Sequence, residues 1–402
     1  MLARRAGWDL TPGPLALRVA ALRAQGLPVL DLTDANPTHA GLAAPAEALA
    51  LALGELARDA RALRYDPDPR GEPPVRAAIA ACHRGAAPDH VVLCAGTSEA
   101  YAHLFRLLAD PGDAVHLPAP GYPLFEHLAE LEGLEAQRYP LRPPPRGAGA
   151  RWRIDVDALA ASLGPRSRAV VLIHPHNPTG SFVDPEDLEA LRELGRARGL
   201  ALVSDEVFAE SGPERGQPPG ALVGAEAGPL HFALSGASKL LALPQLKVAW
   251  IVAAGPPRER DEALARLEFV ADAYLSVSPL LARALPRLLA QRSGIRRELR
   301  ERVAENRRRL EAAVAGRPSL ACLPAEAGWA AILRLSGAPA DEEDLAVALL
   351  ERAGVLVHPG FVFDLAAPAD APAAHLVLSL LPEPERFAEG VEALLGGVAR
   401  LG

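Results

Sequence analysis

The sequence predicts an α/β fold: a large domain with a mostly parallel sheet between helices, plus a smaller α+β domain. Short apolar runs alternate with helical patterns over the first two thirds of the chain, as expected for a sheet covered on both faces. Beyond about residue 315 strands and helices follow one another in a different order. The length of 402 residues is also about twice what one compact core needs.

Five short apolar runs in the first part of the chain predict buried strands. Each is bounded by polar or glycine-containing segments. Asp184 and Pro185 mark the start of a helix that Gly199 ends, and Ser98 is expected to cap another helix. From about residue 258 to 315 the pattern is helical. The predicted strands cover residues 91–95, 169–173, 200–204, 231–234 and 247–253.

The C-terminal part predicts strands at 329–335, 355–357 and 376–381. Helices are predicted at 342–353 and 384–395, with Gly396 and Gly397 ending the second. A first helix, capped by Thr11 with Pro12 and ended by Gly26, is expected to pack on this smaller domain. The predicted domains are therefore residues 45–285 for the large one, and 1–44 with 286–402 for the small one.

Bulk composition argues against several classes of protein. The net charge of −8 disfavours nucleic acid or an anionic membrane as a main partner. The three cysteines have neither disulfide-like nor zinc-like spacing, so no metal site is predicted and a reducing compartment is indicated. We find no signal peptide and no apolar run long enough to span a membrane. A cytoplasmic location is therefore expected.

Four polar clusters follow predicted strands, at the sheet edge where ligands bind in open parallel sheets. They begin at Gly96, His174, Ser204 and Ser235. Taken singly, each has an ordinary structural explanation: a helix cap, a proline-rich turn, a cap or metal ligand, and a surface lysine. The first could bind a phosphate through backbone N–H groups.

Two of these clusters carry groups whose burial would give them special chemistry. Lys239 lies among alanine and leucine residues, and burial lowers the pKa of a lysine and frees its amine to attack a carbonyl. Asp205 ends an apolar strand, where a carboxylate is costly unless it faces a cation. Asn177 can offer an amide N–H to an oxyanion.

In combination, these pieces resemble the class I/II aminotransferases, the aspartate aminotransferase-like family of fold type I enzymes that use pyridoxal 5′-phosphate (PLP). The matching pieces run in family order over most of the chain, and the gaps between Asn177, Asp205 and Lys239 look like those of the family. They are Tyr65 with Gly71, residues 96–100, residues 120–123, residues 176–180, residues 204–207, and Ser238-Lys239 with Lys247.

The resemblance implies a role for each matching residue. Lys239 would hold PLP as an imine and shuttle the proton between the substrate Cα and the cofactor, with Asp205 paired to the ring nitrogen. Asn177 would donate to the ring oxygen and Tyr122 would stack on the ring. The phosphate would be held by Thr97, Ser98, Ser238 and Lys247. Tyr65 is expected to reach the phosphate of a neighbouring subunit, which implies a homodimer.

Four positions depart from the family pattern. Phe208 stands where many relatives have a tyrosine, Lys247 replaces the usual arginine, and Gly236 stands where relatives often have a serine. Most importantly, Val377 occupies the place of the arginine that grips the substrate carboxylate. Candidates to compensate for it are Arg64, Arg70 and Arg334, although each is more simply a surface or structural arginine.

The expected function is transfer of an amino group between an amino acid and a 2-oxo acid. The alternative is a PLP lyase or decarboxylase of the same fold, because cofactor motifs do not decide which Cα bond breaks. A non-catalytic PLP- or amine-sensing regulator is a third, less favoured hypothesis. The sequence does not identify the amino donor or acceptor.

Overall fold

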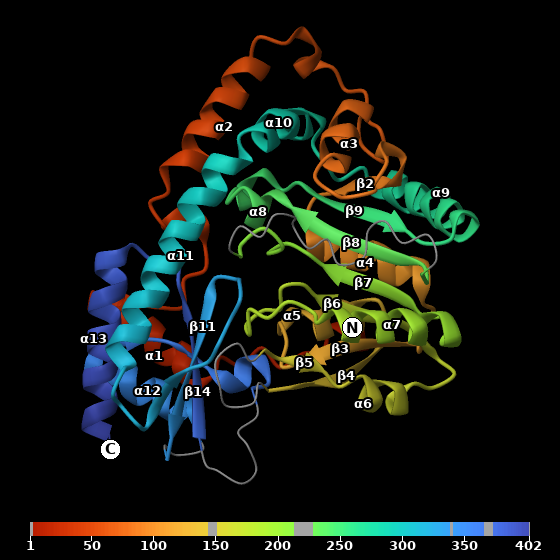
Figure 1. Cartoon of the computed structure of the whole chain (residues 1–402). Helices are drawn as coiled ribbons and strands as arrows, with labels where there is room; N and C mark the ends of the chain where they lie inside the picture. The colour runs from red at the N-terminus through yellow and green to blue at the C-terminus, as the bar shows by residue number, and fades with distance from the viewer. Residues whose placement is uncertain (1–2, 144–150, 213–227, 338–340, 366–372, 402) are drawn as a thin grey trace.

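The computed structural model describes residues 3–143, 151–212, 228–337, 341–365 and 373–401. Its main feature is an eight-stranded sheet (Figure 1). The order is β2 (Val91–Cys94), β9 (Ala249–Ala254), β8 (His231–Gly236), β7 (Ala201–Asp205), β6 (Ser167–Ile173), β3 (Ala114–Ala119), β4 (Glu135–Arg142) and β5 (Arg153–Ile154). The pairs from β8 through β4 are parallel, whereas β9 is antiparallel to both neighbours and β5 is antiparallel to β4.

The central strands are apolar at successive positions because helices cover both faces of the sheet. Along β6, Val171 packs into the core on one face, whereas Val170 and Leu172 pack into the core on the other. Successive side chains of a strand point to opposite faces, so a strand buried on both sides cannot alternate apolar with polar residues. This explains why the strands could be predicted from short unbroken apolar runs.

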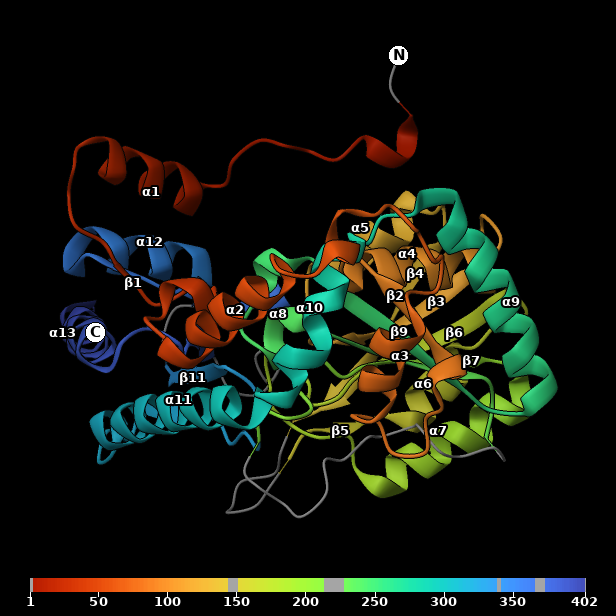
Figure 2. The same cartoon turned by 90° about the horizontal axis from the view of Figure 1, so that it is seen from above.

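Helices cover the two faces of the large sheet in separate groups (Figures 1 and 2). One face is covered by α4 (Thr97–Leu108), α5 (Leu124–Leu131) and α9 (Pro257–Tyr274), whose apolar residues form a common core with it. The other face is covered by α3 (Pro73–Ala80), α6 (Val156–Ser162), α7 (Pro185–Arg198), α8 (Ala237–Leu240) and α10 (Pro279–Ala290).

A second, four-stranded sheet lies beside the first (Figure 1). Its order is β10 (Leu320–Cys322), β11 (Ala330–Ser336), β14 (Ala373–Ser379) and β13 (His358–Pro359), and all of its pairs are antiparallel. Two further strands, β1 (Leu30–Asp31) and β12 (Val355–Leu356), pair in parallel. The helices around them are α1 (Pro14–Ala24), α2 (Ala43–Leu56), α11 (Arg292–Val314), α12 (Glu342–Ala353) and α13 (Pro384–Leu401).

Short 3-10 helices complete the described structure. They are η1 (Arg4–Ala6), η2 (Pro37–His39), η3 (Ala60–Leu63), η4 (Pro88–His90), η5 (Pro244–Leu246) and η6 (Gly360–Phe363). As predicted, α1 packs against α12, and its Leu22 joins Leu350 in a small core. None of the helices within the described ranges has the length and apolarity needed to cross a bilayer. The division of the chain into two domains at the residues given above stays a prediction.

The structure confirms the fold class and the predicted strands to within a few residues, but three predicted helix signals are wrong. Ser98 does not cap α4, because the helix already begins at Thr97 and Gly96 precedes it. Thr11 does not cap α1, whose N-cap is Gly13. The glycine pair at 396–397 does not end the last helix, which continues to Leu401.

Gly397 has a packing role instead. A Cβ atom at this position would lie 2.8 Å from the Leu349 side chain and 3.1 Å from Ala353, both on α12. The missing side chain therefore allows α12 and α13 to approach closely, and glycine inside a helix costs only about 1 kcal/mol relative to alanine.

Candidate active site

A cavity of about 290 Å³ opens where β6, β7 and β8 end and the second sheet approaches. Parallel strands end together at this edge, which is where open α/β sheets bind ligands. The predicted site residues Thr97, Ser98, Tyr122, Asn177, Asp205, Ser238 and Lys239 all line it. Its other walls are mostly apolar and include Ile173, Phe208, Trp329, Phe363, Val377 and Leu378.

Asp205 is a buried acid at the end of β7, held by neutral donors. One oxygen accepts a hydrogen bond from the Tyr101 hydroxyl at 3.1 Å, and the other accepts one from the Val207 backbone N–H at 3.2 Å. Burial raises the pKa of Asp205 to about 6, although these hydrogen bonds and the charge of Lys239 act in the opposite direction. A cationic ring nitrogen in the cavity would stabilise the carboxylate.

Lys239 lies on α8, directly after the edge of β8, and two aromatic rings lie near its amine. The Nζ atom is 5.0 Å from the Trp329 ring centroid and 5.6 Å from that of Phe208. Burial lowers the pKa of Lys239, while the Asp205 carboxylate acts to raise it. A lysine with a lowered pKa is more often a free amine, which is the form that attacks a carbonyl carbon.

One end of the cavity suits a phosphate group. No side chain caps the N-terminus of α4, where Gly96 precedes Thr97 and Ser98. Backbone N–H groups and the helix dipole favour an anion there. Lys247 does not line the cavity itself, but a Cβ atom on Gly96 would lie only 3.4 Å from its Nζ atom. The ammonium group therefore lies beside this loop.

Gly236 also lines this end of the cavity, and the structure explains why it is not a serine. A Cβ atom at position 236 would lie 2.9 Å from the Cβ of Ala249 and 3.2 Å from the Val248 carbonyl oxygen on the neighbouring strand. A larger residue would have to push β8 and β9 apart. Ser238, which lines the cavity, is the nearby hydroxyl that remains.

Asn177 is positioned by a turn that is anchored to the segment between β10 and β11. The Gly180 carbonyl accepts hydrogen bonds from the backbone N–H groups of Glu326 at 3.0 Å and Ala327 at 2.9 Å. Gly180 has a φ of +69°, and a Cβ atom there would lie 2.3 Å from the Ala327 oxygen. Glycine is therefore required for this close approach, which links the Asn177 turn to the segment before Trp329.

Tyr122 and Tyr65 lie in different places. Tyr122 lines the cavity and contacts Phe125 edge to face, with ring centroids 5.6 Å apart. Burial raises its pKa, and Asp205 adds to this effect. Tyr65 does not line the cavity, and it is 74% exposed beside a separate hollow that includes Gly71. Within one chain, the structure therefore does not bring Tyr65 to the other site residues.

Val377 lies in the cavity wall, but none of the three arginines suggested to compensate for it does. Arg64 forms an ion pair with Asp66 at 3.3 Å on the surface. Arg70 donates to the Asp89 carbonyl oxygen, and Arg334 lies on β11 opposite His375. Within one chain, the structure therefore does not bring Arg64, Arg70 or Arg334 to the cavity, and their role in carboxylate binding stays a prediction.

Sequence reasoning missed several cavity residues that come from distant segments. Thr33 follows β1, His358 is in β13, and Ser379 ends β14. Tyr101 on α4 was also not predicted, although its hydroxyl holds Asp205. No local pattern marks these residues, because they meet only when the small sheet packs against the large one.

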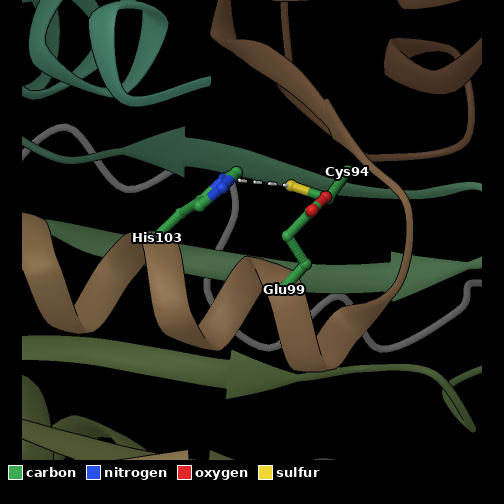
Figure 3. Close-up of side chains that lie close together, drawn as sticks. All are labelled: Cys94, Glu99 and His103. Atoms are coloured by element: carbon green, nitrogen blue, oxygen red, sulfur yellow. Dashed lines mark hydrogen bonds between the residues drawn. The ribbon is translucent and has the colours of Figure 1, made fainter. Parts of the chain in front are cut away.

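Cys94, Glu99 and His103 form a group beside the start of α4, in which Cys94 and His103 are buried and Glu99 is half-buried (Figure 3). Their ligand atoms lie within 4.8 Å of one another, with the Cys94 sulfur 3.9 Å from the His103 Nδ1 atom. The Glu99 carboxylate already accepts hydrogen bonds from the Ala95 N–H and the Ser276 hydroxyl, each at 2.7 Å. Burial raises the pKa of the Cys94 thiol, which disfavours the thiolate form that binds metals. The hydrogen bonds of Glu99 therefore suit a role in bracing the loop better than a role in metal binding.

Comparison with known proteins identifies the class of this fold and site. The family model for aminotransferases of class I and II matches residues 28–375, so the chain belongs to that family. Enzymes of this family use PLP. The fold is that of fold type I aminotransferases: the alanine aminotransferase structure from Pyrococcus furiosus superposes with a TM-score of 0.87 at 21% identity, covering 100% of both chains.

Two curated relatives show the level of similarity. The arginine–pyruvate transaminase AruH of Pseudomonas aeruginosa is 32% identical over 335 residues, which cover 80% of this chain and 79% of the relative. Capreomycidine synthase of Streptomyces vinaceus is 34% identical over 295 residues, or 73% of this chain and 72% of the relative. Together with the family match, the transaminase relatives support a PLP-dependent aminotransferase and do not favour the lyase alternative.

Proposed function

We propose that this chain binds PLP covalently through Lys239 and transfers amino groups between an amino acid and a 2-oxo acid. The observation that carries the proposal is that one cavity holds both an amine whose pKa is lowered by burial and a buried acid whose hydrogen-bond donors, among the described residues, are neutral. These are the groups that an aldehyde cofactor with a basic ring nitrogen requires.

The cavity residues fit the cofactor on structural grounds. Asp205 would hold the ring nitrogen in its protonated form, and Asn177 would donate to the ring oxygen. Tyr122 would cover the ring. The start of α4, with Thr97, Ser98, Ser238 and Lys247 near it, would hold the phosphate. When bound, PLP supplies an electron sink for the pair left behind when the substrate Cα loses its proton.

Lys239 has a second task in this proposal. Once substrate has displaced Lys239 from the cofactor, its free amine would be the base that removes the proton from the substrate Cα. The same amine would then deliver that proton to the cofactor. The same burial that lowers its pKa favours the base form of this amine. Trp329 and Phe208 flank the amine and exclude water from it.

A half-reaction screen tests the function. The holoenzyme is mixed with a panel of amino acids, and the visible absorption band is followed in single turnovers. Amino transfer predicts that the band is lost with a reactive amino acid and returns when a 2-oxo acid is added. Release of ammonia or CO₂ with the band retained would instead show lyase or decarboxylase chemistry.

We further propose a homodimer in the cytoplasm, in which Tyr65 acts on the partner's cofactor. Large apolar side chains are exposed at and next to the hollow beside Tyr65. Leu275, which lines this hollow, is 40% exposed, and its chain neighbour Tyr274 is 54% exposed. Exposed apolar patches mark association surfaces. Light scattering would give the mass in solution.

Mixed dimers give the sharper test. Dimers of one Lys239→Ala subunit and one Tyr65→Phe subunit contain one intact site only if Tyr65 acts across the interface. Cofactor affinity of the wild-type level in half of the sites supports the proposal. If every remaining site is weakened, Tyr65 acts within its own subunit or not at all.

A further inference from the structure

The cavity has little positive charge to offer a substrate. Among the described residues that line it, only Lys239 and His358 can carry a positive charge. Under the proposed function Lys239 is engaged with the cofactor, so it is not free to act as a counter-ion. An amino acid and a 2-oxo acid both bring a carboxylate. Placing that charge between mostly apolar walls is costly unless it is paired.

His358 lines the cavity at a position where it could contact the substrate carboxylate. In the antiparallel pairing of β13 with β14, His358 is opposite Val377, and both residues line the cavity. The imidazole packs edge to face on Phe363, with ring centroids 5.7 Å apart and an interplanar angle of 81°. Thr33 and Ser379 supply two of the cavity's hydroxyl groups; Thr33 follows β1, and Ser379 ends β14, which pairs with β13.

The free imidazole is held in its neutral form. Burial lowers the pKa of His358, while the Asp31 carboxylate and a backbone hydrogen bond with Thr33 act to raise it. Because that hydrogen bond favours the charged form, the ring is its donor. One ring nitrogen is thus occupied, and the other carries a lone pair. A carboxylate cannot bond to a lone pair, so it needs an added proton.

The charged groups near His358 allow that proton to be gained. Asp31 is the acid that acts on the ring directly. On the adjoining helix α12, Glu342 is already committed to the backbone N–H groups of Phe361 and His375, each at 2.6 Å. The other titratable residues that line the described cavity are Tyr122, Asp205 and Lys239, and His375 lies on β14.

We propose that His358 is the residue that binds the substrate carboxylate, and that it takes up one proton from solvent as the carboxylate enters. This inference rests on the proposed function. The proton adds to the free ring nitrogen, which then donates to the carboxylate as one partner of a buried ion pair. It returns to solvent when the carboxylate leaves, so no other reactant is needed.

Two arginines line a neighbouring hollow instead of the main cavity. Arg296 and Arg300 line a small hollow that shares Lys239, Phe208 and Trp329 with the main cavity, and the two aromatic rings form part of its wall. Arg296 is paired with Glu210 at 2.8 Å. Arg300, which lines this neighbouring hollow, is the competing cation that the experiment tests against His358.

Calorimetry counts the proton. The holoenzyme is titrated with 3-phenylpropanoate, an unreactive monocarboxylate that suits apolar walls, in two buffers of different ionisation enthalpy at pH 7.5. The number of protons taken up is compared between wild type and the His358→Asn, His358→Gln and Arg300→Gln variants. 3-Phenylpropanamide is the uncharged control ligand. The visible band reports any proton that the cofactor linkage binds, and each variant must keep that band.

We expect wild type to take up about one proton more than either His358 variant, and Kd for the acid to rise about tenfold or more in those variants. The amide should bind all proteins alike, and Arg300→Gln should behave as wild type. Equal proton counts in wild type and the His358 variants, or loss of acid binding in Arg300→Gln alone, would overturn the inference. A protein with no visible band would instead contradict the proposed function, so the two failures are distinguishable.

Discussion

The hydroxyl of Tyr101 donates a hydrogen bond to a carboxylate oxygen of Asp205 across 3.1 Å, in the buried interior beneath the cavity. Tyr101 lies on α4 and Asp205 ends β7, so the bond joins a helix to the edge of the sheet that it covers. A neutral donor stabilises a buried carboxylate less than a cation does. Without a cofactor, the ionised form of the buried Asp205 carboxylate is therefore destabilised.

Replacing Asp205 with asparagine is expected to stabilise the cofactor-free protein. The native pKa of about 6 lies above the unfolded value of 3.8, so the charged form is disfavoured by folding. The penalty is absent below pH 3.8, grows as pH rises to 6, and is complete above it; it amounts to about 3 kcal/mol. Urea unfolding of the cofactor-free proteins at pH 5 and pH 8 would measure this.

In the holoenzyme, by contrast, Asp205→Asn should be unfavourable. Asp205→Asn removes the partner of the ring nitrogen, so we expect cofactor affinity to fall and the transfer rate to drop by about a hundredfold or more. If the variant were less stable than wild type without cofactor at pH 8, the raised pKa of Asp205 would be refuted.

Phe208→Tyr should lower the pH at which the visible band of the bound cofactor titrates. Phe208 lines the cavity and places an apolar ring 5.6 Å from the Lys239 Nζ atom, with no hydroxyl to offer. A tyrosine adds a donor that favours the charged form of the bound cofactor's ring oxygen, and a fall of about one pH unit is expected. Phe208→Leu is the control, and an unchanged midpoint in Phe208→Tyr would reject the argument.

Val377→Arg should make carboxylate binding independent of His358. Val377 is opposite His358 in the β13–β14 register, and its side chain reaches the cavity. A permanently charged guanidinium there needs no added proton. We expect tighter binding of 3-phenylpropanoate, by about tenfold, and a smaller dependence of Kd on pH. Val377→Met controls for side-chain bulk, and an unchanged pH dependence in Val377→Arg would count against the placement.

Alanine substitutions at the glycine pair in α13 should have opposite effects on stability. A Cβ atom at 397 collides with Leu349, whereas one at 396 meets only the flexible end of Arg400, at 3.6 Å. Gly397→Ala is expected to cost about 1–3 kcal/mol in the free energy of unfolding. Gly396→Ala should gain up to about 1 kcal/mol from helix propensity. Equal effects in a denaturant titration would contradict the packing role.

The sequence was sufficient for the strands and for the residues next to them. Continuous apolar runs predicted β6 and β7, and polar residues directly after them predicted Asn177 and Asp205 as cavity residues. The local pattern worked because the residues that end parallel strands are brought together by the sheet itself.

Contributions from distant segments could not be predicted in this way. His358 lies in β13 and Thr33 follows β1, and each of these strands has only two residues, which give no periodic signal. Gly397 was misread because a glycine that allows close helix packing has the same local signature as a glycine that ends a helix. Only the contact with Leu349 separates the two meanings.

The identity of the cofactor-bearing lysine is the central claim, and reduction followed by peptide mapping tests it most directly. The holoenzyme is treated with borohydride, digested, and analysed by mass spectrometry. We predict a reduced pyridoxyl adduct on the peptide that contains Lys239, and on no peptide of a Lys239→Ala variant. An adduct on the peptide with Lys247, or no adduct on any peptide, would contradict the account.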